Sequence, residues 1–143
     1  MRPKLFNLWS GFVQQVATLS TCNRTQVGCL LLSCDGERLL SFGYNGTWRG
    51  GPNQPEGGDY PGTPDWVHAE QNALVKSRPF EPFIAMITHT PCYACAMLLV
   101  NSQVTRVYCL QEYRDRSGLL LLDKALVSTY VGLLNNWSVY GGG

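Results

Sequence analysis

The chain has 143 residues, of which 45% are hydrophobic and 15% charged, and this composition fits one soluble globular domain over residues 1–143 with a substantial core. A formal net charge of +1 argues against an electrostatic funnel for polynucleotides, so we expect no nucleic-acid partner. The N-terminus does not resemble a signal peptide, and no apolar run approaches the ~18 residues that a membrane span needs. We therefore expect a cytoplasmic protein without membrane contact.

The first third of the sequence predicts a helix followed by a β-hairpin. Apolar residues recur at helical spacing and predict an amphipathic helix from about Lys4 to Leu19, which is expected to supply packing and no chemistry. A continuous apolar run at 27–32 predicts a buried strand. Turn-forming residues at 34–37 lead into a second strand at 38–42, which completes the hairpin.

A segment rich in glycine and proline follows the hairpin. Gly43-Tyr44-Asn45-Gly46 ends the second strand, and its Asn-Gly pair, from spacing alone, favours a turn. Residues 46–64 make a longer connection than compact domains normally contain, as lids and binding loops do. Trp48 and Arg49 within this loop offer a stacking face and a partner for phosphate.

The remaining sequence alternates between helical and strand patterns. The predicted elements are a helix beginning at His68, a strand at 83–88, a helix from 92 to about 102, a strand at 106–110, a helix at 119–126, a strand at 127–134 and a disordered tail at 141–143. This alternation predicts an α/β fold whose parallel strands are joined by right-handed crossovers. Because open α/β sheets bind ligands at the carboxyl ends of their strands, functional residues are expected there.

Two short pieces of sequence carry candidate metal ligands. His68 and Glu70 form an H-x-E motif, and Cys92 and Cys95 form a P-C-x-x-C motif after Pro91. One histidine and two cysteines are typical of a catalytic zinc site that keeps a fourth position for water. Glu70 is then a candidate proton carrier beside that water rather than a fourth ligand.

Helix starts are predicted at both pieces. Thr90 is a candidate N-cap and Pro91 a candidate first helical residue, which would place Cys92 and Cys95 on one face of the first turn. A metal between this helix start and the one at His68 would meet two positive dipole ends, which favour thiolate over thiol. A C-x-x-C motif alone would equally fit a redox pair, half of a structural zinc site or two core cysteines. Together with H-x-E it forms the signature of zinc-dependent deaminases.

The chain resembles the deoxycytidylate (dCMP) deaminases of the cytidine deaminase-like superfamily, specifically the short phage type, and the resemblance runs over nearly all of it. The whole superfamily shares the zinc motif, whereas the G-Y-N-G stretch points to dCMP deaminases. The matching stretches are residues 24–29, 43–47, 68–73, 90–96 and 106–108, with Tyr113 beyond them. The resemblance implies a three-layer α/β/α fold with a five-stranded mixed sheet and, for a phage protein, a place in the host cytoplasm.

The resemblance also implies a reaction. Zn²⁺ would be held by His68, Cys92 and Cys95, and Glu70 would take a proton from the attacking water and pass protons to the ring nitrogen and the departing ammonia. The product, dUMP, would supply thymidylate synthesis. The implied substrate-binding residues are Asn45 at the sugar, the backbone of Ala69 and Thr90 at the base, Tyr113 stacked near the base, and Arg24. For the substrate phosphate, Arg24, Arg49 and Arg114 all stay open.

Several members of this family are homo-oligomeric hexamers that nucleoside triphosphates control together with Mg²⁺, dCTP as activator and dTTP as inhibitor. By analogy, the expected effector-binding residues are Gly43, Tyr44, Asn45, Gly46, Trp48 and Arg49. This analogy replaces the turn interpretation of Asn45. The loop from Gly50 to Trp66 lacks the extra metal ligands that some relatives carry, so effector contacts made by such loops do not transfer.

Two other functions stay open from sequence alone. One is deamination of another cytosine-containing substrate, such as dCTP, cytidine or a base in a polynucleotide, and the near-neutral charge argues mildly against the last of these. The other is a non-catalytic nucleotide-binding module that zinc merely stabilises.

Overall fold

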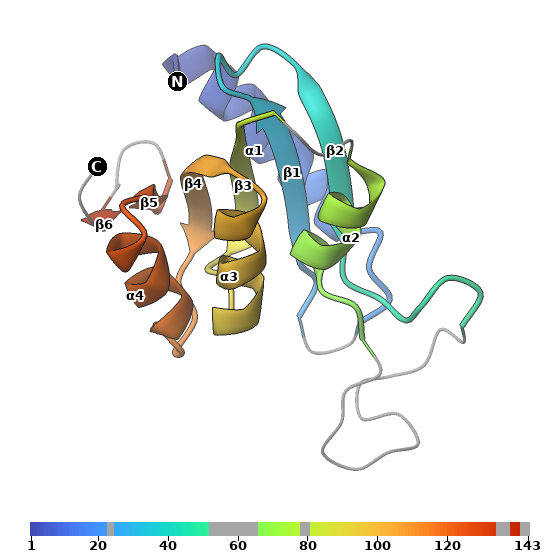
Figure 1. Ribbon diagram of the computed structural model, residues 1–143. Coiled ribbons are helices and arrows are strands. Elements are labelled where there is room, and N and C mark those ends of the chain that lie inside the picture. Colours follow the sequence, from blue (N-terminus) through green and yellow to red (C-terminus); the bar gives the residue numbers. More distant parts are fainter. Residues whose placement is uncertain (23–24, 52–65, 78–80, 134–137, 141–143) are drawn as a thin grey trace.

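The computed structural model describes residues 1–22, 25–51, 66–77, 81–133 and 138–140. They form three layers, in which one mixed sheet lies between helices on its two faces (Figure 1). The helices are α1 (Pro3–Ala17), α2 (Ala69–Lys76), α3 (Tyr93–Asn101) and α4 (Ser117–Lys124). The strands are β1 (Gly28–Ser33), β2 (Leu39–Tyr44), β3 (Phe83–His89), β4 (Val104–Gln111), β5 (Ser128–Val131) and β6 (Ser138–Tyr140). Their order in the sheet is β2-β1-β3-β4-β5-β6. The predicted α/β/α class with five mixed strands is confirmed, and the short β6, which was not predicted, extends the sheet beyond β5.

The strand pairing places several chain segments at one edge of the sheet. β1 runs antiparallel to β2 and to β3, whereas β3, β4 and β5 run parallel to one another. The parallel pairs are connected through α3 and α4, as the alternating pattern predicted. The carboxyl ends of β3 and β4 therefore share an edge with the end of β2 and the beginning of β1. Residues 68 and 92–95 lie at this edge because α2 and α3 begin there.

The two faces of the sheet carry separate apolar cores. On one face, α2, α3 and α4 cover alternate strand residues, and this core includes Cys29, Leu31, Ala85, Ile87, Val107 and Cys109. On the other face α1 packs its apolar stripe, with Phe6, Val13 and Val16 fully or almost fully buried. β1 is buried along its whole length because both of its faces are covered, which explains its continuous apolar sequence.

Several helix boundaries differ from the prediction, and α4 spans Ser117–Lys124 where residues 119–126 were predicted. α1 ends at Ala17, because the backbone N–H of Thr18 already turns back to the carbonyl of Gln15. The predicted start of α3 was wrong by two residues: Cys92 is the N-cap, and its Sγ accepts a hydrogen bond from the Cys95 N–H at 3.4 Å. Thr90 instead continues the sheet by donating its N–H to Gln111 O at 2.9 Å. The predicted strand at 127–134 and the tail at 141–143 fall partly or wholly outside the described residues.

Gly43 lets α2 lie directly on β2. A Cβ atom at this position would stand 2.5 Å from both the Ala69 carbonyl oxygen and the Ala73 backbone nitrogen. Both neighbours are backbone atoms, so neither can rotate away. This close approach fixes the height of α2 above the sheet, and with it the position of the N-cap residue His68.

We expect Gly43→Ala to lower the free energy of unfolding by about 1–3 kcal/mol, because the added methyl group must displace α2. Gly11→Ala is the matched control, since a Cβ there meets no atom within 4 Å and Ala is the better helix former. That variant should keep or raise stability by about 0.5–1 kcal/mol. Urea denaturation of both variants measures the two changes in the free energy of unfolding. If Gly43→Ala were no more destabilising than Gly11→Ala, this account of the α2–β2 contact would be wrong.

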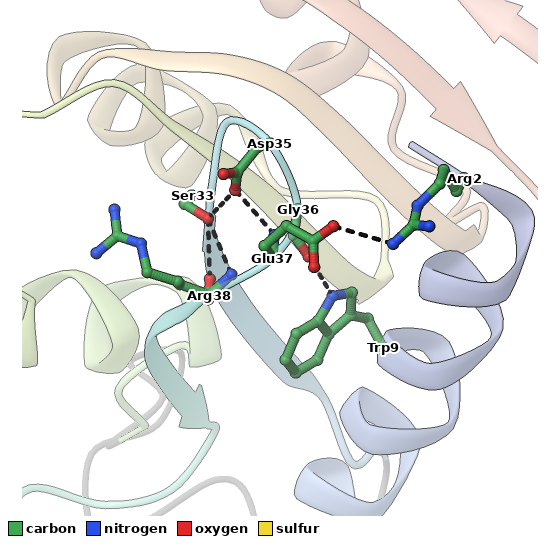
Figure 2. A network of polar contacts seen from close by, with 7 residues as sticks. All are labelled: Arg2, Trp9, Ser33, Asp35, Gly36, Glu37 and Arg38. Carbon is green, nitrogen blue, oxygen red and sulfur yellow. Dashed lines mark hydrogen bonds and ion pairs between the residues drawn. The ribbon is translucent and has the colours of Figure 1, made fainter.

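A polar network ties α1 to the turn between β1 and β2 at the opposite edge of the sheet (Figure 2). Trp9 Nε1 donates to Gly36 O at 2.8 Å, and Asp35 accepts from Ser33 Oγ and from Glu37 N. Arg2 and Glu37 form an ion pair that is largely exposed and therefore contributes little stability. This end of the molecule has a structural role.

In the parts of the chain that the structure describes, no helix combines the length and the apolar character required to cross a bilayer.

Candidate active site and metal centre

Three soft donor atoms converge at the functional edge of the sheet. His68 is the N-cap of α2, Cys92 is the N-cap of α3, and Cys95 lies in the first turn of α3. His68 Nδ1 is 3.3 Å from Cys95 Sγ and 3.6 Å from Cys92 Sγ, and the ligand atoms of the three residues all lie within 4.8 Å of one another. The structure thus brings together the three predicted ligands, and Nδ1 is the histidine nitrogen that faces both sulfurs.

This geometry fits a zinc ion. Ligand atoms bound at about 2.0–2.3 Å to a tetrahedral zinc lie roughly 3.3–3.8 Å apart, which is the range of the two nitrogen–sulfur distances. One imidazole and two thiols are also the donor types that zinc prefers. Among the described residues these three form the only such group of potential ligands. Three protein ligands are the number that catalytic zinc sites commonly keep, with water in the fourth position.

Backbone contacts hold the ligand-bearing segments in place. The His68 N–H donates to Gln71 Oε1 at 2.8 Å, which closes the first turn of α2. Preceding it, Val67 pairs with Gly46 through two backbone hydrogen bonds of 2.6 and 3.1 Å, so the end of β2 is joined to the His68 segment. On the other side, a Cβ on Gly118 would stand 2.1 Å from the Pro91 carbonyl oxygen. The absence of a side chain at residue 118 lets α4 rest on the backbone that carries Cys92.

Glu70 lies beside this cluster and is almost completely buried, with 4% of its surface exposed. Burial is the main cause that raises the pKa of its carboxyl group above the usual value, and a hydrogen bond with Cys95 acts in the opposite direction. The buried thiols of Cys29 and Cys109 also sense its charge, since Glu70 raises the pKa of both after the larger effect of their own burial. The carboxyl group is therefore close enough to interact with the ligand cluster and with the buried thiols of the core. An acid in such a setting holds a proton more readily than an exposed glutamate does.

The two cysteines differ in their protonation in the metal-free protein. Hydrogen bonds from the Cys95 thiol and from His68 lower the pKa of Cys92 to about 4. The same hydrogen bond and burial raise the pKa of Cys95, so one sulfur is a thiolate at neutral pH and the other is its donor. A bound divalent cation would hold both as thiolates.

We expect the metal-free protein to lose one thiolate as the pH falls through about 4. Because this folded-state pKa lies below the ordinary value of 9.0, the thiolate stabilises the metal-free fold fully above pH 9 and progressively less as the pH falls towards 4. The ultraviolet absorbance of the thiolate measures this titration, and Cys92→Ser should abolish it. A midpoint near the ordinary cysteine value would contradict the assignment.

The residues expected at the base lie close to the ligand cluster. Ala69 and Thr90 are buried, with 0% and 2% of their surfaces exposed. The Thr90 N–H is bonded to Gln111 O, and its Oγ1 accepts from the Tyr113 N–H at 2.9 Å. A backbone contact from Thr90 to a base would therefore use its carbonyl oxygen. Tyr113 lies just past β4 at the same edge of the sheet, with 39% of its surface exposed.

Asn45 is occupied by the segment that precedes β1. Its Oδ1 accepts from the Val27 N–H and its Nδ2 donates to Thr25 O, both at 2.9 Å. These bonds fix residues 25–27, and a contact with a sugar would have to use the second N–H and the second lone pair of the amide. Arg24, which precedes this segment, lies outside the described residues.

The other residues expected at an effector site have mixed environments. Gly43 packs under α2, as described above, and Tyr44 O accepts from Asn72 Nδ2 at 2.8 Å. Trp48 and Arg49 are exposed in the loop beyond Gly46. Lys76, which the sequence did not single out, joins this side: its ammonium lies 4.5 Å from the centre of the Phe42 ring, and its pKa is lowered by burial and then by the charge of Arg49.

One contact at this edge of the sheet was not predicted from the sequence. From its place in the sequence His89 needs no catalytic role, and in the structure its ring stacks on Tyr113 with 4.8 Å between the ring centroids. The signal that could have found this pair is the register of two parallel strands, because His89 is the register partner of Gln111, two residues before Tyr113.

Comparisons with known proteins support the geometric description. Residues 8–111 match the family described as the cytidine and deoxycytidylate deaminase zinc-binding region. The deoxycytidylate deaminase of Mycobacterium phage D29 is 30% identical to this chain, over 74% of this chain and 94% of the relative. The crystal structure of dCMP deaminase from the cyanophage S-TIM5 in complex with dCMP and dUMP is 29% identical and superposes with a TM-score of 0.82, covering 92% of this chain and 98% of that one.

Cellular relatives are longer than this chain. The probable deoxycytidylate deaminase of Caenorhabditis elegans is 32% identical over 71% of this chain, and the deoxycytidylate deaminase of Saccharomyces cerevisiae is 30% identical over 87%. This chain spans 56% of the first relative and 45% of the second, about half of their length. The resemblance stated from the sequence is confirmed by the phage relatives, which match along nearly their whole length. With its family match and its His/Cys/Cys cluster, the chain belongs to the cytidine and deoxycytidylate deaminase family.

Proposed function

We propose that this chain is a zinc-dependent hydrolase that converts dCMP and water into dUMP and ammonia. The observation that carries the proposal is a buried carboxyl group, Glu70, set against the convergent donors of His68, Cys92 and Cys95. The choice of nucleotide is supported by the cyanophage protein, whose structure holds dCMP and dUMP.

Each residue of the cluster would have a defined part in the reaction. His68 Nδ1 and the two sulfurs would hold zinc, which would supply the Lewis acidity that makes water a good nucleophile at neutral pH. The Glu70 carboxylate would accept a proton from the attacking water and then donate it to N3 of the cytosine ring. A second proton would pass through Glu70 to the departing amino group, so that a C4–O bond forms, the C4–N bond breaks and ammonia leaves. Burial of Glu70 favours this role because it helps the carboxyl group to hold the proton between the two transfers.

The base would lie between the starts of α2 and α3. Ala69 and the Thr90 carbonyl would meet its polar edge, Tyr113 would stack on its face, and Asn45 would meet the sugar. The phosphate would be bound by an arginine, for which Arg24, Arg49 and Arg114 are the candidates. These roles follow from the resemblance, and the hydrogen bond between the Tyr113 N–H and Thr90 Oγ1, which holds these two residues together beyond the ends of β3 and β4, supports them for Thr90 and Tyr113.

Regulation and assembly are further parts of the proposal. We place dCTP as activator and dTTP as inhibitor, each with Mg²⁺, at the end of β2, where Trp48 and Arg49 are exposed and Lys76 lies near Arg49. The assembled form would be a homo-oligomer, a hexamer by analogy with the family, acting in the cytoplasm as a single domain that supplies dUMP for thymidylate synthesis.

A substrate panel tests the activity. Zinc-loaded protein should release ammonia from dCMP faster than from cytidine, dCTP or cytosine-containing oligonucleotides, and dCTP and dTTP should raise and lower the rate. If the protein released ammonia faster from another compound of the panel, that compound and not dCMP would be its substrate. Folded, zinc-loaded protein that leaves the whole panel unchanged would favour a non-catalytic module instead.

A further inference from the structure

Two aromatic rings from different strands stack beside the candidate active site. His89 is the last residue of β3, and Tyr113 follows the end of β4 by two residues. Their ring centroids are 4.8 Å apart and their planes differ by 21°, which is a stacked arrangement. Because Cys92 follows His89 by only three residues, the stack lies on the chain segment that leads into the candidate metal ligands.

The imidazole of His89 is held at its edges. Its Nδ1 is 2.9 Å from Thr88 Oγ1, which in turn accepts the Gly28 N–H at 3.1 Å. The Gln111 side chain also acts on the imidazole as a hydrogen-bonding group, and this raises the pKa of His89 by less than burial lowers it. Burial is the larger influence on the ring and lowers the pKa of His89, so the imidazole is neutral at neutral pH. His89 is therefore a neutral ring whose orientation is set by contacts with its neighbour Thr88 and with Gln111 of β4.

The backbone of Tyr113 is held by the same segment. Its N–H donates to Thr90 Oγ1 at 2.9 Å, and the Thr90 N–H donates to Gln111 O at 2.9 Å. These bonds continue the pairing of β3 with β4 past the ends of both strands. The direction in which the Tyr113 side chain leaves the backbone is thus fixed, while its χ angles are restrained by contact with the His89 ring.

We propose that His89 is a positioning residue: by stacking behind Tyr113 it sets the plane in which the tyrosine ring meets the pyrimidine base of the substrate. The inference rests on the proposed function, in which Tyr113 stacks near the base. The hydrogen-bonding partners of the imidazole and its stacked face hold Tyr113 in place. His89 takes no part in the reaction itself, since the proposed mechanism uses neither of its nitrogens for a proton transfer. Its effect is on substrate binding, because a tyrosine ring that can rotate away loses contact with the base before any bond changes.

A pair of His89 variants separates the stacking face from the hydrogen bonds. His89→Leu and His89→Phe are both apolar and both leave Thr88 Oγ1 and Gln111 without the imidazole, but only Phe keeps an aromatic face. For zinc-loaded protein, we expect His89→Leu to raise KM for dCMP and Kd for the product dUMP by about 10-fold, with kcat and zinc content within about 2-fold of the wild type. His89→Phe should bring both constants back to within about 3-fold of the wild type.

A double-mutant cycle tests whether His89 acts through Tyr113. Adding His89→Leu to Tyr113→Ala should raise KM little beyond the effect of Tyr113→Ala alone, because the support has lost the ring that it positions. Additive effects would overturn the inference, as would equal KM values for the Leu and Phe variants, or a loss of zinc or kcat without a change in KM and in Kd for dUMP.

The same measurements distinguish this inference from the proposed function. If the wild-type protein deaminates another cytosine compound and not dCMP, the dCMP assignment fails, and the comparison of variants on that compound still tests His89. If the wild-type protein deaminates dCMP but the variants behave alike, the proposed function stands and the role of His89 is refuted. Calorimetric binding of dUMP provides a readout that does not depend on turnover.

Discussion

Glu70→Gln is expected to lower the turnover number for dCMP at least ~100-fold while zinc content and fold stay unchanged. The amide has the shape of the carboxyl group but cannot accept a proton from water and release it to the base. Since Glu70 is 4% exposed, bulk water cannot easily replace it as the proton carrier. Steady-state kinetics, zinc analysis and a thermal melt of the same sample measure the three quantities together.

Glu112→Gln is the matched control for this change. Glu112 lies on the same edge of the sheet, but its carboxylate is partly exposed and pairs with Arg116 at 2.8 Å. We expect its replacement to change turnover less than about 2-fold, because partly exposed ion pairs of this kind contribute little energy. Near-normal turnover of Glu70→Gln, with zinc bound, would refute the proton-carrier role and would favour a zinc-stabilised binding module.

The positions of the chemical groups were more predictable from the sequence than the contacts that hold them. His68, Cys92 and Cys95 could be placed together because helix starts and strand ends are local signals, and parallel strands bring such ends to one edge. The start of α3 was misjudged because Thr90 and Pro91 satisfy the usual preferences for a helix start. The Cys92 sulfur takes over the capping role, which depends on its contact with the Cys95 N–H.

Contacts between distant segments set the limit of the sequence reasoning. Asn45 was expected to reach a sugar, and the structure shows its amide bound to residues 25 and 27, which pairing of β1 with β2 brings alongside it. The His89–Tyr113 stack joins residues that only the register of β3 and β4 makes neighbours. Neither contact leaves a periodic or compositional trace in the sequence. Such contacts become visible only when the strand register is known.

Cys95→Ser should abolish zinc binding at micromolar metal and, with it, all deamination. Loss of a single outer-shell partner typically weakens metal affinity 10- to 100-fold, so loss of a sulfur ligand should cost at least about 100-fold. Cys95 is a better choice than Cys92 for this test, because the Cys92 sulfur also caps α3 and its removal would destabilise the helix independently of the metal. Metal analysis after dialysis measures the loss, and Cys34→Ser, at an exposed free cysteine, is the control.

The thermal response to zinc gives the same prediction a second readout. A metal that binds only the folded state raises its stability in proportion to the logarithm of the metal concentration, so the wild-type Tm should rise as zinc is added to the metal-free protein. The Tm of Cys95→Ser should stay flat over the same range, while that of Cys34→Ser should follow the wild type. If Cys95→Ser kept one zinc per chain and a rising Tm, the ion would have to be held without this sulfur. The cluster of one imidazole and two thiols that supports the hydrolytic function would then be the wrong one.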